Sequence, residues 1–89
     1  MKSRTTLAFR ELLAELPVRV QRHAKQAYRL FQENHSHPGL QFKQVLPNPP
    51  TYSVRVGLHH RAIGALREGA IVWYWIGSHA DYDKLLERL

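Results

Sequence analysis

The chain has 89 residues, 44% of them apolar, with thirteen basic and seven acidic side chains, a net charge of +6 and no cysteine. This composition excludes a disordered chain, disulfides and cysteine-based metal sites, and no run approaches the about 20 apolar residues that a membrane-spanning helix needs. We therefore expect one cytoplasmic domain over residues 1–89, with no membrane partner.

Two amphipathic helices are predicted in the first third of the chain. The first covers Thr6–Leu16, where leucines recur at helical spacing, and Pro17 ends it because the residue before a proline is pushed out of the helical conformation. The second covers Val18–Gln32. Its apolar residues mark one buried face: Val20, Ala24, Ala27 and Phe31. Before these helices, Lys2–Thr6 offers at most a stub of a strand.

The period of the apolar pattern changes from helical to alternating after the turn residues 34–39. Short separations between the alternating segments predict antiparallel hairpins. A last helix is expected over His79–Arg88, with Ser78 as its N-cap. The predicted strands are Leu40–Leu46, Thr51–Leu58, Arg61–Ala65 and Ala70–Ile76. The fold class is therefore α+β: an N-terminal helical hairpin packed on a small antiparallel sheet of three to four strands, with a C-terminal helix.

Positive charge is concentrated in the middle of the chain. Between Leu16 and Arg67 the only acidic residue is Glu33, whereas the last segment mixes both signs. Such a field attracts phosphates, and RNA is the leading candidate partner; a solvated basic surface kept for solubility is the alternative. The basic residues of this stretch are Arg19, Arg22, Lys25, Arg29, Lys43, Arg55, Arg61 and Arg67.

Two arginines in the predicted sheet are candidate phosphate contacts. Arg55 should lie on the strand face opposite Val54, on an open surface, although an ordinary solvent-facing arginine is the alternative. Arg61 follows two histidines at the turn into the next strand, where its planar fork can grip a phosphate through two hydrogen bonds. Adjacent histidines point in different directions in an extended chain, so we expect no metal site there.

The start of the last helix is a candidate catalytic position. His79 should lie in its first turn, where the helix dipole favours an anion and disfavours the charged imidazolium. A neutral imidazole beside a phosphate is what a general base for RNA cleavage requires. A structural role for His79 is the alternative, and Tyr82 lies on the apolar stripe of this helix, where a core role competes with substrate contact.

The ordered set of these features resembles the RelE/ParE superfamily of bacterial toxins over about residues 9–86. The resemblance includes Leu16-Pro17, Tyr52-Ser53-Val54-Arg55-Val56 and Arg61-Ala62. It continues with Trp73-Tyr74-Trp75-Ile76-Gly77-Ser78-His79 and Tyr82-Asp83. It implies a toxin of a type II toxin–antitoxin pair, normally held inactive by an antitoxin protein.

The resemblance also implies an activity for some members. RelE-like and HigB-like toxins cut mRNA on the ribosome without a metal or cofactor, by attack of a ribose 2′-OH on the neighbouring phosphate. Carried over by position, Arg55 and Arg61 would grip the phosphate and stabilise the transition state. His79 would act as general base or acid, and Lys43 and Tyr82 would contact substrate.

Two other functions stay open at the level of sequence. ParE-like members share the fold, do not cut RNA and are associated with inhibition of DNA gyrase, so fold alone does not choose between the branches. The chain also carries a lighter cluster of lysine and arginine on its sheet than several ribosome-dependent members. An inactive toxin-like binding module is therefore the third alternative.

Overall fold

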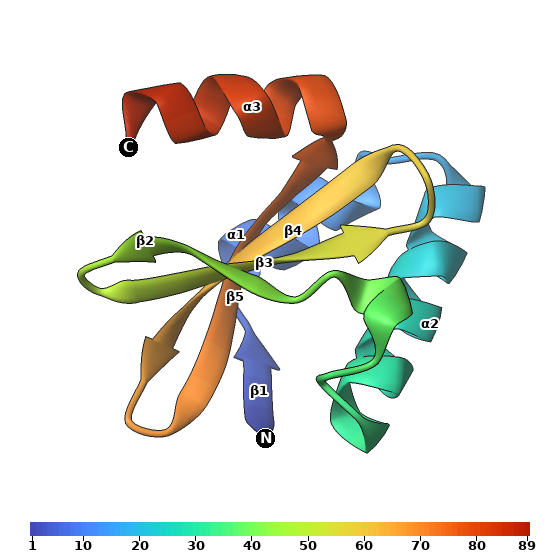
Figure 1. Ribbon diagram of the computed structural model, residues 1–89. Coiled ribbons are helices and arrows are strands. Elements are labelled where there is room, and N and C mark those ends of the chain that lie inside the picture. The colour runs from blue at the N-terminus through green and yellow to red at the C-terminus, as the bar shows by residue number, and fades with distance from the viewer.

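The computed structural model describes residues 1–89 and contains three α-helices, one short 3-10 helix and five strands (Figure 1). The chain begins with β1 (Lys2–Thr5), α1 (Leu7–Ala14) and α2 (Val18–Glu33). It continues with the 3-10 helix η1 (Pro38–Leu40), β2 (Lys43–Pro47), β3 (Pro50–Val56), β4 (His60–Arg67), β5 (Ala70–Ser78) and α3 (His79–Arg88). The sequence predicted the α+β class and the order from α1 onward of the three α-helices and the strands β2 to β5, but it predicted neither β1 as a paired strand nor η1.

The five strands form one sheet in the order β1-β5-β4-β3-β2. The pairs from β2 to β5 are antiparallel, as expected of short hairpin connections, whereas β1 lies parallel to β5, with Ser3 opposite Ile71. Two expectations were therefore wrong: the sheet has five strands instead of three or four, and Lys2–Thr5 is a paired edge strand instead of a stub. The pairing of β1 with β5 connects residues far apart in the chain, such as Lys2 and Ala70, so no local sequence pattern predicts it.

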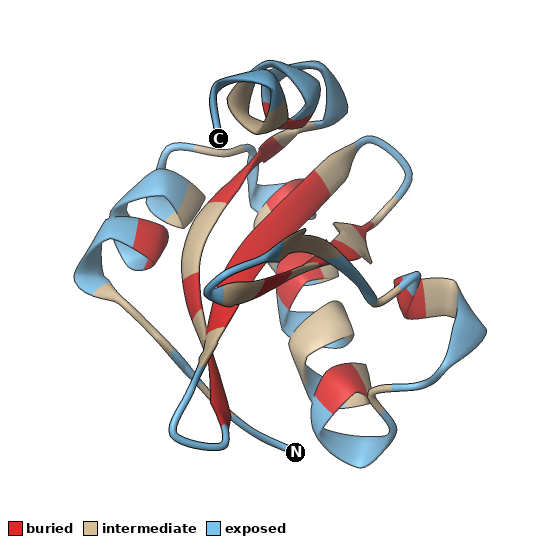
Figure 2. Cartoon of the chain, turned by 60° about the vertical axis from the view of Figure 1, so that its left-hand side comes forward, coloured by how far each residue is buried: buried red, intermediate tan, exposed pale blue.

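Helices α1 and α2 cover one face of the sheet. Phe9 of α1 and Val20 and Phe31 of α2 are buried against it, and Trp73 of β5 packs edge-on against Phe31 with their ring centroids 5.4 Å apart. Figure 2 shows the buried residues along the central strands and on the inner sides of these helices. This core also contains residues of the sheet that alternate along the strands: Val54, Val56, Ala62, Ile71 and Ile76.

Helix α3 packs over the opposite face. Ser53 and Arg61 alternate along their strands with Val54 and Ala62, so their side chains point away from α1 and α2. The hydroxyl of Tyr82, on α3, hydrogen-bonds to Ser53 across 3.1 Å. The N-cap prediction for α3 is confirmed, since the Asp81 N–H donates to Ser78 Oγ over 3.1 Å. The sheet is therefore covered on both faces around β4.

Element boundaries differ from the predictions mainly at turns. Leu58 was placed in a strand but lies in the turn between β3 and β4, where its side chain is exposed. Helix α1 ends at Ala14, two residues before the predicted end, since the backbone N–H groups of Glu15 and Leu16 make shorter-range bonds to Leu12 and Leu13. None of the helices is long and apolar enough to cross a membrane.

Candidate functional site

Arg61 is a buried cation beneath α3. Only 5% of its surface is exposed, which is unusual for a side chain that is always charged. Its Nη1 donates to Gln41 Oε1 at 3.0 Å, and its Nη2 donates to the Gln41 carbonyl at 3.3 Å and to Ser53 Oγ at 3.2 Å. Its Nε is buried and has no hydrogen-bond acceptor in the protein. All the acceptors around the guanidinium are therefore neutral.

Tyr82 covers the same guanidinium. The Arg61 Cζ atom lies 5.2 Å from the centre of the Tyr82 ring, within the range of a cation–π contact. Tyr82 is 3% exposed and Ser53 is fully buried, so this part of the sheet is not the open surface that the sequence indicated. The structure thus gives Tyr82 a packing role, although substrate contact by this residue stays a prediction.

No carboxylate neutralises Arg61. The one close contact between a basic and an acidic side chain is elsewhere, between His79 Nδ1 and Asp83 Oδ1 at 3.9 Å on the exposed side of α3, and it is an ion pair only when the imidazole is protonated. Removing a charge from water is costly unless it is paired, and buried arginines are usually balanced by acids. Arg61 therefore holds a positive charge in the protein interior with hydrogen bonds and an aromatic face as its only compensation.

Arg55 and Lys43 lie on the same face as Arg61, toward the sheet edge. Arg55 is half-buried and stands directly opposite Arg61 in the β3–β4 register. It borders a cavity of about 360 Å³ that also touches His23 of α2. Lys43 is exposed at the start of β2, opposite Ser53. The structure therefore brings together the three basic residues that the sequence singled out, but it buries one of them.

His79 lies at the first position of α3, as predicted. Its backbone N–H donates to the His59 carbonyl over 2.8 Å, and its side chain is exposed. Its imidazole centroid lies 5.7 Å from the centroid of the Tyr82 ring, and the same ring contacts the Arg61 guanidinium. A titratable exposed group and a buried cation thus flank one aromatic ring.

Three histidines, His23, His59 and His60, lie where the turn between β3 and β4 meets α2. Burial, together with the positive charges of His59, Arg19 and His23, lowers the pKa of His60 below its ordinary value. Gly57 has a φ of +61°, and a Cβ placed there would lie 2.6 Å from His23 Nδ1. His37, in the next loop, is used locally, because its Nδ1 accepts the Gly39 N–H. No cluster of histidine and acidic side chains in the structure is arranged to hold a metal ion.

Two members of the Arg61 environment were missed by sequence reasoning. Gln41 was included in the predicted strand Leu40–Leu46 without any charge or motif to mark it, whereas it lies between η1 and β2, and Ser53 was noted only as a small neighbour of Arg55. Gln41 has a φ of +47°, a left-handed conformation that few residues other than glycine adopt. The residue type gives no signal for this conformation, because glutamine is not among the residues enriched in the left-handed region.

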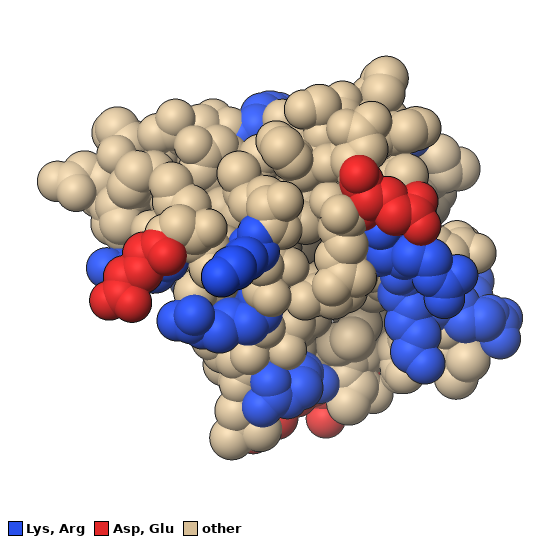
Figure 3. Space-filling model, turned by 90° about the horizontal axis from the view of Figure 1, so that it is seen from below, with Lys and Arg blue, Asp and Glu red and all other residues tan.

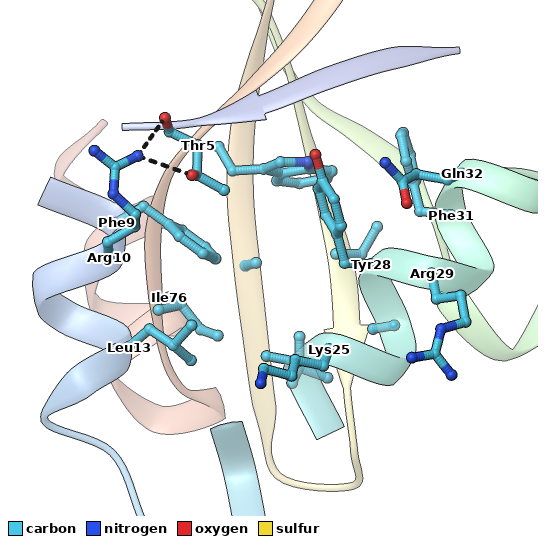
Figure 4. A pocket seen from close by; sticks show the side chains of 16 residues that line it. Thr5, Phe9, Arg10, Leu13, Lys25, Tyr28, Arg29, Phe31, Gln32 and Ile76 are labelled. Atoms are coloured by element: carbon cyan, nitrogen blue, oxygen red, sulfur yellow. Dashed lines mark hydrogen bonds between the residues drawn. The ribbon is translucent and has the colours of Figure 1, made fainter. Parts of the chain in front are cut away.

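An apolar groove of about 460 Å³ opens between α1 and α2 (Figure 4). Phe9 and Leu13 point into it from α1, and Tyr28 does so from α2. The groove carries basic residues, Arg10, Lys25 and Arg29, and no acidic residue lines it. Arg10 Nη1 is bonded to the carbonyl and the hydroxyl of Thr5. On the face seen in Figure 3, lysine and arginine atoms form several groups and acidic atoms are fewer.

Comparisons with known proteins agree with this fold. The ParE-like toxin domain family matches residues 18–84. A chain of the RelBE2 toxin–antitoxin complex from Mycobacterium tuberculosis has a similar structure, with a TM-score of 0.58 and 22% identity, covering 88% of this chain and 96% of that one. No curated protein matches the sequence.

The structural likeness, at this level of identity, concerns the fold alone. The family match covers most of the chain, from the start of α2 into α3, and includes Arg55, Arg61 and His79. The family match therefore shows that the chain belongs to the ParE-like toxin domain family, within the RelE/ParE superfamily of toxins.

Proposed function

We propose that this protein is the toxin of a type II toxin–antitoxin pair and that it cleaves mRNA, on the ribosome, without a metal. The observation that carries the proposal is the buried Arg61, a cation that no acid of the chain neutralises. An enzyme that stabilises a pentacoordinate phosphorane needs positive charge held in a fixed place before the reaction begins. A purely structural arginine would be expected to have a carboxylate partner.

The proposed reaction is an internal transfer at phosphorus. The ribose 2′-OH loses its proton and its oxygen bonds to the adjacent phosphorus, while the bond from phosphorus to the 5′-oxygen of the next nucleotide breaks. The products are a 2′,3′-cyclic phosphate and a 5′-OH, the leaving 5′-oxygen taking up the proton that the 2′-OH lost. Atoms and charge balance with no oxidant or co-reactant.

Each candidate residue has a role in this scheme. His79, exposed at the start of α3, acts as general base or acid, since an imidazole exchanges protons near neutral pH. Arg61 and Arg55 contact the phosphate and offset the charge that develops on its oxygens. Lys43, at the exposed end of β2, binds a neighbouring phosphate of the RNA. Tyr82 supports Arg61 and borders His79.

The antitoxin is proposed to occupy the groove between α1 and α2. The groove combines an apolar floor, including Trp73 and Ile76, with three basic side chains and no acidic one. The complementary ligand is an amphipathic segment with apolar residues on one side and acidic residues on the other. Binding there leaves α3 and Arg61 on the opposite face of the sheet.

The test is a cell-free translation reaction in which transcript ends are mapped by primer extension. Wild-type protein should produce discrete cuts within translated codons, and His79→Ala should abolish them while retaining the fold by circular dichroism. Glu87→Ala, an exposed change on the same helix, is the matched control and should cut normally. Cuts of wild-type frequency with His79→Ala would refute the assigned catalytic role.

A second function is favoured by the family match, whose name is that of ParE-like toxins. In this alternative the protein inhibits DNA gyrase and does not cut RNA. Induction would then leave mRNA intact and raise the DNA-damage response, and purified protein would inhibit supercoiling by gyrase. Intact message, normal translation and normal gyrase activity together would leave a toxin-like binding module without catalytic function.

A further inference from the structure

Gln41 closes the outer side of the Arg61 environment. Its side chain is exposed, whereas Arg61, Ser53 and Tyr82 are all buried. It directs two oxygens at one guanidinium: Oε1 at 3.0 Å from Nη1 and the backbone carbonyl at 3.3 Å from Nη2. An exposed residue is thus the contact of Arg61 that is nearest to solvent.

The backbone of Gln41 is held in a conformation that its residue type disfavours. Its φ of +47° and ψ of 42° place it in the left-handed region just after η1. A side chain in this region costs free energy unless the surrounding contacts hold it there, and such outliers cluster at functional positions. In this conformation both the side-chain amide oxygen and the backbone carbonyl of Gln41 accept hydrogen bonds from Arg61.

The Arg61 guanidinium could bind a phosphate, but the Gln41 amide oxygen occupies one of the places that a phosphate oxygen would take. A guanidinium binds an oxyanion through two parallel N–H bonds, and charge-assisted bonds of this kind are about twice as strong as neutral ones. The Gln41 Oε1 atom supplies a neutral oxygen at Nη1, while Nε has no acceptor. An RNA phosphate that replaced this amide oxygen would give Nη1 an anionic acceptor.

We propose that Gln41 is a displaceable gate over Arg61, whose amide oxygen occupies the place of a substrate phosphate oxygen until RNA binds. This inference rests on the proposed function, because it takes the phosphate of RNA as the ligand of Arg61. It adds a positioning residue, Gln41, that acts through Arg61 and covers the cation in the free protein.

The neutrality of Gln41 is the essential chemical property of the gate. A glutamate at this position would form a charge pair with Arg61, which a phosphate would have to break. An amide holds the guanidinium in place without neutralising it. The gate therefore predicts opposite effects for two substitutions of one residue, whereas a merely structural role predicts that both weaken binding.

The test measures the dissociation constant of a fluorescent single-stranded RNA, blocked against cleavage by 2′-O-methyl groups, by anisotropy at constant salt. Gln41→Gly removes the side chain and suits the left-handed backbone, so RNA should bind about twofold to tenfold more tightly, the range of one net hydrogen bond. Gln41→Glu should weaken binding at least about tenfold, as expected of a buried charge pair that must break.

Gln44 provides the controls, because it is exposed on the neighbouring β2 strand and its side chain donates only to the Leu46 carbonyl. Gln44→Glu adds the same negative charge nearby and measures how far such a charge weakens RNA binding in general. Gln44→Ala measures the effect on RNA binding of losing an exposed amide. Thermal unfolding accompanies each titration, and Gln41→Glu should unfold at a higher temperature than wild type. If Gln41→Gly fails to fold, Gln41→Ala replaces it with the same expected direction.

The outcomes separate the gate from the nuclease. Wild-type affinity in Gln41→Gly, or equal weakening by glutamate at positions 41 and 44, overturns the gate even if the wild-type protein cuts mRNA. Absence of RNA binding in both wild type and Gln41→Gly overturns it as well. The expected pattern in a protein that cuts no message supports the gate and refutes the nuclease.

Discussion

The Tyr82 hydroxyl donates a hydrogen bond to Ser53 Oγ over 3.1 Å, and this bond joins α3 to β3 across 29 positions of the chain. The same Ser53 oxygen accepts a hydrogen bond from Arg61, so a single hydroxyl supports both the helix and the cation. The stability of α3 and the position of Arg61 are thereby coupled.

Tyr82→Phe should lower the free energy of unfolding by about 0.5–1.5 kcal/mol, the net value of one hydrogen bond. The phenyl ring keeps its place over Arg61, so the change isolates the hydroxyl. Urea denaturation of the two proteins measures the difference. Tyr82→Ala also removes the ring from its buried site and should cost about 3–5 kcal/mol. Equal stabilities of the Phe and Ala variants would contradict the packing role of the ring.

Gly64→Ala should destabilise the sheet by about 1–3 kcal/mol, the usual cost of overfilling a core. A Cβ at Gly64 would lie 2.7 Å from Ile71 Cγ2 and 2.7 Å from Trp73 Cε3, two side chains that have no room to move because both are buried. Thermal unfolding compares this variant with Gly69→Asn, whose side chain would enter open space in a left-handed turn that asparagine tolerates. A larger loss at Gly69 would count against the argument.

The stability of the protein should fall as the pH is lowered from about 7, in part because of His60. Burial and nearby His59, Arg19 and His23 lower the pKa of His60, so the unfolded chain binds a proton that the folded chain resists. The contribution of His60 is complete above its unfolded pKa of about 6.5 and is lost as the pH falls through the lowered folded value. The melting temperature measured between pH 7.5 and 5 records this loss.

His60→Gln should flatten that part of the pH profile, since glutamine does not titrate. Above pH 7.5 the wild-type and variant curves should run parallel, which serves as the internal control. An unchanged slope between pH 7 and 5 in the variant would show that other groups account for the pH dependence.

The affinity for single-stranded RNA should fall as the salt concentration rises. Arg55→Ala and Lys43→Ala should each lower the magnitude of the slope of log affinity against log salt concentration by about 0.7. This is the value for one phosphate contact on a single strand. Both residues lie near Arg61 on the face of the sheet that meets α3. Arg67→Ala, at the other end of β4, removes the same charge as Arg55→Ala and should leave the slope unchanged. Equal slope changes for all three variants would indicate diffuse attraction instead of a site.

The elements were predictable because their signals are local. The leucine spacing before Pro17 and the Ser78 cap mark the ends of helices through contacts within a few residues, and α3 begins and ends where predicted. The face of the strand on which Arg55 lies was also predictable, because the alternation of side chains along a strand determines it. The parallel pairing of β1 with β5 was not predictable, because it joins Thr5 to Trp73 across 68 positions.

The positions of Arg55 and His79 within their elements were predictable from the sequence, whereas the burial of Arg61 and its contacts with Gln41 and Ser53 were not. The sequence by itself determined the basic middle of the chain, the strand face of Arg55 and the histidine in the first turn of α3, since these follow from composition and short periodicities. Only the tertiary structure decided that Arg61 is buried beneath Tyr82 and held by Gln41. Burial arises where segments distant in the chain meet, and the three side chains that surround this guanidinium come from β3, α3 and the loop before β2.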